Sequence, residues 1–141
     1  MYAELHCKTN FSFLAGASHA DELVDAAVKL GYSALAVTDE NSLAGVVRAF
    51  GAARETKLKL IIGAEILLGD APPLVLWATD RQSYGNLSKL ITVGRRRAPK
   101  GECWLALEDV AQFQAGLIAG CLLYTSPSPR DATLSRMPSS A

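Results

Sequence analysis

The sequence predicts an α/β fold in which parallel strands alternate with helices, and three observations support this prediction. Three short apolar runs each end at a polar residue: His6, Asp39 with Glu40 beside it, and Glu65. Between these runs, apolar residues recur every three or four positions, as one face of a helix requires. Strands joined by helical crossovers run parallel, so their carboxyl ends lie at one edge of the sheet. We therefore expect His6, Asp39 and Glu65 to meet at that edge, where α/β folds place their sites.

The first two strand–helix units occupy roughly the first third of the chain. The first strand is the run that ends at His6, and a helix follows it. Ser18 begins this helix as a favourable N-cap, and Gly31 ends it as a C-cap. Residues 33–38 are expected to form a second, buried strand, after which a second helix begins near Ser42.

A third strand and a third helix are expected in the middle of the chain. Residues 58–66 are mostly apolar, which is typical of a strand covered on both faces. A Pro-Pro pair at 72–73 breaks the chain before a fourth strand at 74–78. The third helix is expected over residues 81–93, with Asp80 as its N-cap.

The remaining segments are shorter. Residues 95–101 are expected to form a basic loop, residues 108–113 a short helix and residues 116–121 a fifth strand. The composition then changes abruptly to one rich in serine and proline. Such a stretch buries too little apolar surface to offset the entropy cost of ordering it, so residues 122–141 are predicted to be a disordered tail. Within it, residues 122–131 look like translated sequencing-adapter read-through, and we interpret the tail as foreign to the protein rather than as an ordinary disordered terminus.

Length and composition exclude several classes of protein. A chain of 141 residues fits one domain of about 100–150 residues. Fourteen basic residues balance fourteen acidic ones, so net charge indicates nothing about nucleic acid. Cys7, Cys103 and Cys121 are odd in number and show no CxxC spacing, so neither a zinc ribbon nor a disulfide framework is indicated. No run approaches the ~20 apolar residues of a membrane span, and the start does not resemble a signal peptide. A cytoplasmic protein with no membrane partner is expected.

Four separated blocks of sequence carry a family resemblance. They are residues 4–18 (ELHCKTNFSFLAGAS), 36–49 (AVTDENSLAGVVRA), 61–65 (IIGAE) and 80–101. Together they resemble the N-terminal part of the PHP (polymerase and histidinol phosphatase) domain that opens bacterial C-family DNA polymerases, in particular their error-prone, translesion branch. The resemblance implies a distorted (β/α)7 barrel, of which residues 1–121 would hold the first four to five strand units and the rest would be missing.

The same resemblance implies a metal cluster at the carboxyl rim of the barrel, of the kind that binds Zn or Mn. This sequence matches the family's ligand pattern at His6, Asp39 and Glu65. Each position also has a structural alternative: His6 as a strand-end histidine bonded to a neighbour, and Asp39 with Glu40 as carboxylates at the start of a helix. The sequence leaves these alternatives open.

Three other positions depart from the family's pattern. Lys8 stands where the family's His-x-His motif has its second histidine, Ala15 replaces the aspartate of Leu-Asp-Gly, and Glu40 replaces the histidine of Thr-Asp-His. An ammonium group ligates a metal only after losing a proton, and its ordinary pKa is ~10.4. Two opposite unit charges 4 Å apart attract by roughly 4 kcal/mol at an effective dielectric constant of ~20, and desolvation offsets part of this. We therefore expect Lys8 to replace the cation, and the rim of this chain to hold no metal.

The resemblance also implies what the whole protein does. A polymerase of this family performs DNA-directed DNA synthesis, here in repair and translesion replication, with DNA and other replication or translesion proteins as partners. Its polymerising carboxylates and their Mg would belong to a palm domain absent from this chain, so the catalytic residues are unknown here and the fragment alone is expected to be inactive. An active metal-dependent phosphoesterase and a purely structural or partner-binding module are the alternatives. The basic residues Arg95, Arg96, Arg97 and Lys100 are either a solvated helix end or contacts to DNA phosphates.

Overall fold

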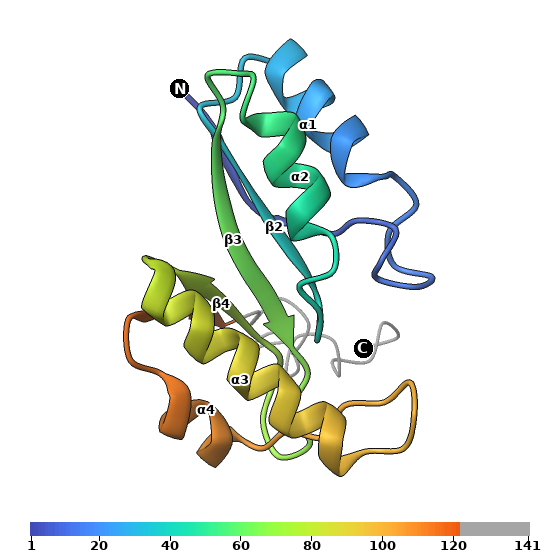
Figure 1. The fold of residues 1–141 in the computed structure, drawn as a ribbon, viewed down its shortest axis with the longest axis vertical. Helices are drawn as coiled ribbons and strands as arrows, with labels where there is room; N and C mark the ends of the chain where they lie inside the picture. The colour runs from blue at the N-terminus through green and yellow to red at the C-terminus, as the bar shows by residue number, and fades with distance from the viewer. Residues whose placement is uncertain (122–141) are drawn as a thin grey trace, which may run out of the picture.

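A computed structural model describes residues 1–121, and the predicted tail at 122–141 lies outside the described residues. Figure 1 shows the α/β fold that the sequence predicts: one curled sheet with helices packed on its outer face. In sheet order, the strands are β1 (Ala3–Cys7), β2 (Ala34–Glu40), β3 (Lys59–Ile66), β4 (Leu74–Ala78) and β5 (Leu117–Cys121). The helices of this part of the chain are α1 (Ala20–Lys29), α2 (Val46–Ala53), α3 (Arg81–Arg97) and α4 (Leu107–Phe113).

The first three strands are parallel, as predicted. Helix α1 connects β1 to β2 and helix α2 connects β2 to β3, and each crossover returns the chain to the same end of the sheet. The β2–β3 ladder continues without a register shift to its last pair, Glu40 beside Glu65. The carboxyl ends of these strands therefore share one rim.

The fourth strand reverses direction and pairs antiparallel with β3. Only residues 67–73 connect the two strands, whereas a parallel connection needs a crossover of about a dozen residues or more. The Pro-Pro pair lies in this short connection. Strand β5 also pairs antiparallel with its neighbour β4, after the chain has passed through α3 and α4. The strict alternation of strand and helix thus ends at β3.

Two hydrophobic cores lie between the sheet and its helices. In the first, Val24 of α1 and Ala49 of α2 pack on Leu35 and Val37 of β2. The second is built around α3 and includes the fully buried residues Ile66, Leu76, Leu87 and Leu90. Both cores cover the same face of the sheet. The opposite face carries the residues that alternate with the core residues along each strand.

Two predicted helix starts were wrong by a few residues. Helix α1 begins after His19 rather than Ser18, because the Glu22 carboxylate accepts the His19 N–H at 2.8 Å. Helix α2 begins at Val46 rather than near Ser42. Asn41 has a φ of 48°, which turns the chain away from a helical course, and the Ser42 hydroxyl accepts the Ala44 N–H in a local turn.

The predicted basic loop at 95–101 was also wrong in its first half, because α3 continues through Arg97. Cations are favourable at a helix C-terminus, where they face the negative end of the helix dipole. The start of α3 is as predicted, since the Asp80 side chain accepts the Ser83 N–H at 2.7 Å. Within residues 1–121, no helix is both long enough and apolar enough to cross a bilayer.

Candidate functional site

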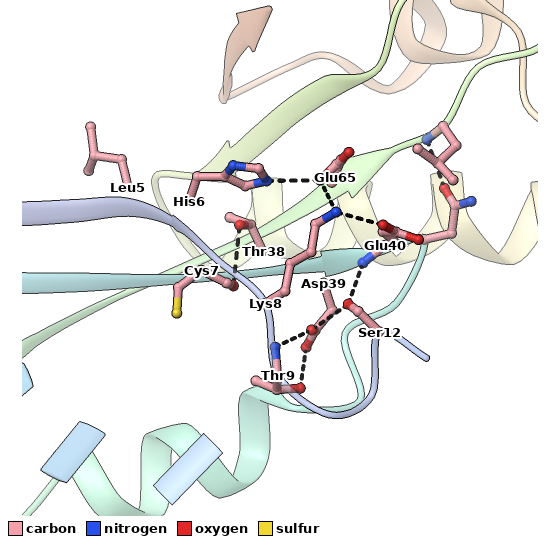
Figure 2. Close-up of polar contacts among 12 residues, drawn as sticks. Leu5, His6, Cys7, Lys8, Thr9, Ser12, Thr38, Asp39, Glu40 and Glu65 are labelled. Carbon is pink, nitrogen blue, oxygen red and sulfur yellow. Dashed lines mark hydrogen bonds and ion pairs between the residues drawn. The ribbon is translucent and has the colours of Figure 1, made fainter. Parts of the chain in front are cut away.

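Four polar side chains from three strands meet at the carboxyl rim (Figure 2). The Lys8 ammonium lies 2.6 Å from Glu40 Oε1 and 2.9 Å from Glu65 Oε2. The His6 imidazole Nε2 lies 2.8 Å from the same Glu65 oxygen. Glu65 Oε2 is therefore shared by an imidazole and an ammonium group.

Strand alternation explains why these four residues share a face. Glu40 and Glu65 are directly paired across β2 and β3, so their side chains project to the same side of the sheet. His6 and Lys8 are two positions apart and project to that side from β1 and its end. Two adjacent carboxylates repel each other, and the positive charge of Lys8 between them offsets this repulsion.

The protonation of Lys8 follows from this environment. Burial alone would lower the pKa of the Lys8 ammonium, but hydrogen bonds and charge interactions with Glu40 and Glu65 outweigh burial and raise the pKa above its ordinary value. Lys8 therefore stays charged at neutral pH. A charged ammonium has no lone pair to offer a metal.

Asp39 is placed apart from this cluster, on the helix-covered face of β2. Its Oδ1 accepts the Thr9 N–H and the Ser12 hydroxyl, both at 2.7 Å, and its Oδ2 accepts the Thr9 hydroxyl at 2.8 Å. Figure 2 shows the carboxylate directed at Thr9 and Ser12 rather than at Glu65. Asp39 is 1% exposed. The structure thus brings His6 and Glu65 together and uses Asp39 to fix the loop after β1.

Ser12 connects this loop to the rim, and the sequence analysis missed it together with Thr9. The Ser12 hydroxyl donates to Asp39 and accepts the Glu40 N–H at 3.0 Å. It therefore helps to orient the strand end that carries Glu40. Strand alternation was the available signal. Adjacent residues such as Asp39 and Glu40 project to opposite faces of a strand, so one of the two carboxylates had to find its partners away from the rim.

Ala15 and Glu40, the other departures from the family pattern, both border cavities at the rim. A cavity of about 460 Å³ is lined by Ala15, His6 and Lys8 at one end and otherwise mostly by apolar residues of α1 and of the start of β2. A second cavity, of about 410 Å³, is lined by Glu40 and by residues of two loops, among them Phe13 and Trp104. The Ala15 methyl group offers no ligand where the family pattern has a carboxylate, and the carboxylate that does line the first cavity belongs to Glu4.

The four basic residues near the end of α3 divide into two pairs. The Arg95 guanidinium donates to the Asn41 carbonyl oxygen at 2.9 Å and to the Gly101 carbonyl oxygen at 3.2 Å. The Arg97 guanidinium lies 2.7 Å from Asp109 Oδ2. All four residues are exposed, and the other two, Arg96 and Lys100, form no ion pair within residues 1–121.

The residues of the rim do not fit the zinc or manganese that the family resemblance implies. In the part of the chain that the structure describes, no three His, Cys, Asp or Glu side chains are grouped as ligands for one ion. Lys8 lies between the two carboxylates, and Asp39 has its oxygens occupied by Thr9 and Ser12. The polar groups of this rim satisfy one another.

Comparison with known proteins identifies the family. Residues 4–134 match the PHP domain family, which is most of the chain. This match runs beyond residue 121, so the predicted division into 1–121 and 122–141 stays a prediction.

Curated relatives include three proteins named error-prone DNA polymerase. The one from Rhodopirellula baltica is 53% identical over 121 residues, covering 86% of this chain and 11% of the relative. Those from Pseudomonas aeruginosa and Bordetella parapertussis are 58% and 55% identical, covering 84% and 91% of this chain and 11% and 13% of the relatives. The chain thus spans about a tenth of the length of the curated relatives it matches.

Two solved structures share the fold. One is a candidate metal-dependent phosphoesterase from Bifidobacterium adolescentis, with a TM-score of 0.57 and 28% identity, covering 68% of this chain and 34% of that one. The other is an amidohydrolase from Chromobacterium violaceum, with a TM-score of 0.57 and 22% identity over the same shares, which shows the fold alone. With matches from the family, from sequence relatives and from solved structures in agreement, the chain belongs to the PHP domain family.

Proposed function

We propose that this chain is the N-terminal portion of the PHP domain of an error-prone DNA polymerase, and that its rim is a structural ion-pair site rather than a hydrolytic centre. The observation that carries the second part is the position of the Lys8 ammonium, 2.6 Å from Glu40 and 2.9 Å from Glu65. The first part is supported by relatives of that name at 53–58% identity. The whole protein would then be a cytoplasmic nucleotidyltransferase that extends primers on DNA past lesions.

In this proposal the chain contributes structure and not chemistry. Polymerisation would take place in a palm domain outside this chain, with Mg and with other replication or translesion proteins as partners of the whole enzyme. The Lys8–Glu40–Glu65 network would hold β1 to β2 and β3 at the rim. Lys8 would do so without a supplied cation.

Exposed cations of this chain would contribute to DNA binding. All four basic residues are exposed, but the guanidinium groups of Arg95 and Arg97 already bind groups of the protein itself. Of the four basic residues, we therefore assign the phosphate contact to Arg96 and Lys100. Phosphate contacts of this kind are independent of base sequence and weaken as salt concentration rises.

The test compares the full-length protein with the present chain. The full-length protein should extend a primer across an abasic template position with Mg, and the 141-residue chain should not. With Zn or Mn, neither should hydrolyse bis(p-nitrophenyl) phosphate above the background seen with Glu65→Gln. Hydrolysis that Glu65→Gln abolishes would establish the phosphoesterase alternative, which the resemblance to the Bifidobacterium protein favours.

A further inference from the structure

Trp77 forms a contact that spans the inner face of the sheet. Its indole Nε1–H donates to the Leu5 carbonyl oxygen at 2.8 Å. Trp77 lies on β4 and Leu5 on β1, and strands β2 and β3 lie between them. In a flat sheet, β1 and β4 would be roughly 14 Å apart, at ~4.8 Å per strand. The indole thus connects strands that become close only because the sheet curls.

The indole lies on the face that carries the rim cluster. Trp77 pairs directly with Gly63 across β3 and β4, and residues paired in this way project to the same side of a sheet. Gly63 is two positions from Glu65, so Trp77 and Glu65 share a face. This face is opposite to the two hydrophobic cores.

Strand β1 is irregular where the indole contacts it. Between Glu4 and Cys7 it contains one more residue than β2 does, which is a β-bulge at Leu5 and His6. A bulge interrupts the ladder and redirects a side chain, here that of His6. The peptide plane that joins Leu5 to His6 is then held from both sides: Trp77 donates to its carbonyl oxygen, and Glu4 Oε1 accepts its N–H at 3.1 Å. Because that plane is rigid, holding it sets the direction in which His6 leaves the strand.

Two glycines provide the space that the indole occupies. A Cβ atom at Gly120 would lie 2.6 Å from the indole Cη2 and 2.8 Å from Cζ3. A Cβ atom at Gly63 would lie 3.0 Å from the indole Cδ1 and 2.5 Å from the Leu76 carbonyl oxygen. The ring therefore fits against the sheet only because both positions lack a side chain. The donor lies on β4, the acceptor on β1, and the two glycines on β3 and β5, so four strands contribute to this contact. We call the space beside these two glycines the seat of the indole.

We propose that Trp77 is a positioning residue for the rim: its indole fixes the curl between β1 and β4 and, through the Leu5–His6 peptide, directs His6 to Glu65. We call the hydrogen bond from Trp77 to Leu5 the brace, and it rests on the contacts of Trp77 alone. Its importance for the ion pairs at the rim rests on the proposed function above. Replacing the indole N–H or filling its seat should loosen β1 and leave the first hydrophobic core intact.

The experiment is hydrogen exchange measured by mass spectrometry on the full-length protein. Trp77→Phe keeps an aromatic ring but removes the donor, so exchange in peptides covering residues 3–8 should become roughly threefold to tenfold faster, the range for one net hydrogen bond. Peptides of α1 should not change. The matched control is Trp104→Phe, because the Trp104 indole donates locally, to Glu102 two residues away. A Trp77→Phe protein with unchanged exchange at residues 3–8, or an equal effect of Trp104→Phe, would overturn the proposal.

A second pair of variants tests the seat. Gly120→Ala should displace the indole and reproduce the effect of Trp77→Phe on residues 3–8. In the double variant the smaller phenyl ring leaves room for the added methyl group, so the two effects should not add. Full additivity would overturn the proposal.

Chemical acetylation of Lys8 reports on the rim separately from stability. Acetylation of Lys8 should increase in Trp77→Phe, while that of the exposed Lys89 should not. If Lys8→Met leaves stability unchanged but Trp77→Phe still loosens β1, the ion-pair proposal fails and the brace stands. If Trp77→Phe leaves both β1 exchange and Lys8 acetylation unchanged, the brace fails whatever Lys8→Met does.

Discussion

Lys8 is the residue whose replacement tests the rim most directly. In Lys8→Met, Glu40 and Glu65 remain paired across the strands without a positive charge between them. The Lys8–Glu40 ion pair is only partly buried, with side-chain exposures of 21% and 30%. We therefore expect Lys8→Met to lower the free energy of unfolding by about 1–3 kcal/mol, between the values for exposed and for buried ion pairs. Thermal unfolding of the PHP domain within the full-length protein would measure it. Lys89→Met, on the exposed side of α3, is the control and should change little.

Replacing Lys8 with an imidazole tests the metal side of the same residue. Lys8→His would place a second imidazole beside His6, Glu40 and Glu65, and imidazole is a good zinc ligand where ammonium is not. We expect zinc affinity to appear in this variant. Calorimetric titration is the measurement. Stoichiometric binding at micromolar zinc or tighter in the unaltered protein, abolished by Glu65→Gln, would mean that the rim is a live metal centre.

The residues of the site were only partly predictable from the sequence. The positions of His6 and Glu65 at strand ends follow from the apolar runs before them, and the structure brings the two together. Asp39 was expected beside them because it also ends a run. Strand alternation directs it to the other face, and a pattern of apolar runs does not say which of two adjacent carboxylates faces the rim.

At the scale of elements, the loop between β1 and α1 depends on Asp39. In Asp39→Asn, the remaining side-chain oxygen can still accept one or two of the three hydrogen bonds. The new NH2 group is itself a donor and cannot accept a hydrogen bond from Thr9 or Ser12, so at least one of the three is lost. Because these groups are buried, we expect a loss of about 2–4 kcal/mol and faster amide exchange over residues 9–16. Asp25→Asn, on the exposed side of α1, should leave that exchange unchanged. An Asp39→Asn protein with normal protection of this loop would show that the carboxylate does not organise it.

The contact between α3 and α4 should depend on pH. The hydrogen bond from Arg97, and then the Ala106 N–H, hold the pKa of Asp109 below its ordinary value of 3.8. A lowered pKa means that the folded state favours the carboxylate, so this contribution is complete above the ordinary pKa and is lost as pH falls below it. Amide exchange in α4, compared at pH 5 and pH 3 after correction for intrinsic rates, should show weaker protection at pH 3. Asp109→Asn should remove that difference.

The helices and strands themselves were largely predictable, and the errors have local causes. Apolar runs predicted the strands of residues 1–121, and apolar periodicity predicted the three longer helices. Helix α2 starts late because Asn41 leaves the strand in a left-handed conformation, which apolar spacing does not reveal. Helix α3 continues into its arginines because the helix dipole and Asp109 stabilise them there.

For the whole molecule, we predict that residues 1–121 alone are poorly stable. Among the described residues, β1 and β5 are the outer strands of the sheet, so each has one side without a partner. The chain also spans only about a tenth of the curated relatives it matches. A soluble monomer of residues 1–121 with a single cooperative thermal transition would contradict this prediction.

The curvature of the whole sheet was the least predictable feature. The short connection at 67–73 requires β4 to reverse, but the pattern of apolar residues does not indicate the bulge in β1. Contacts such as the one between Trp77 and Leu5 join residues far apart in the chain. They arise from the packing of the complete sheet, which no local pattern encodes.

The pairing of Lys8 with Glu40 also has an evolutionary consequence. Because the two side chains are in direct contact, their contributions to stability are coupled, and we expect the two positions to vary together among relatives. A change of Lys8 to histidine alone would exchange the ammonium group for a ligand that needs a metal ion supplied by the cell. A change of Glu40 alone would leave Lys8 with only part of its counter-charge. The two positions are therefore expected to change together: a histidine at position 8 alone would add a metal ligand, but it would leave Glu40 and Glu65 without the charge of Lys8 whenever metal is scarce.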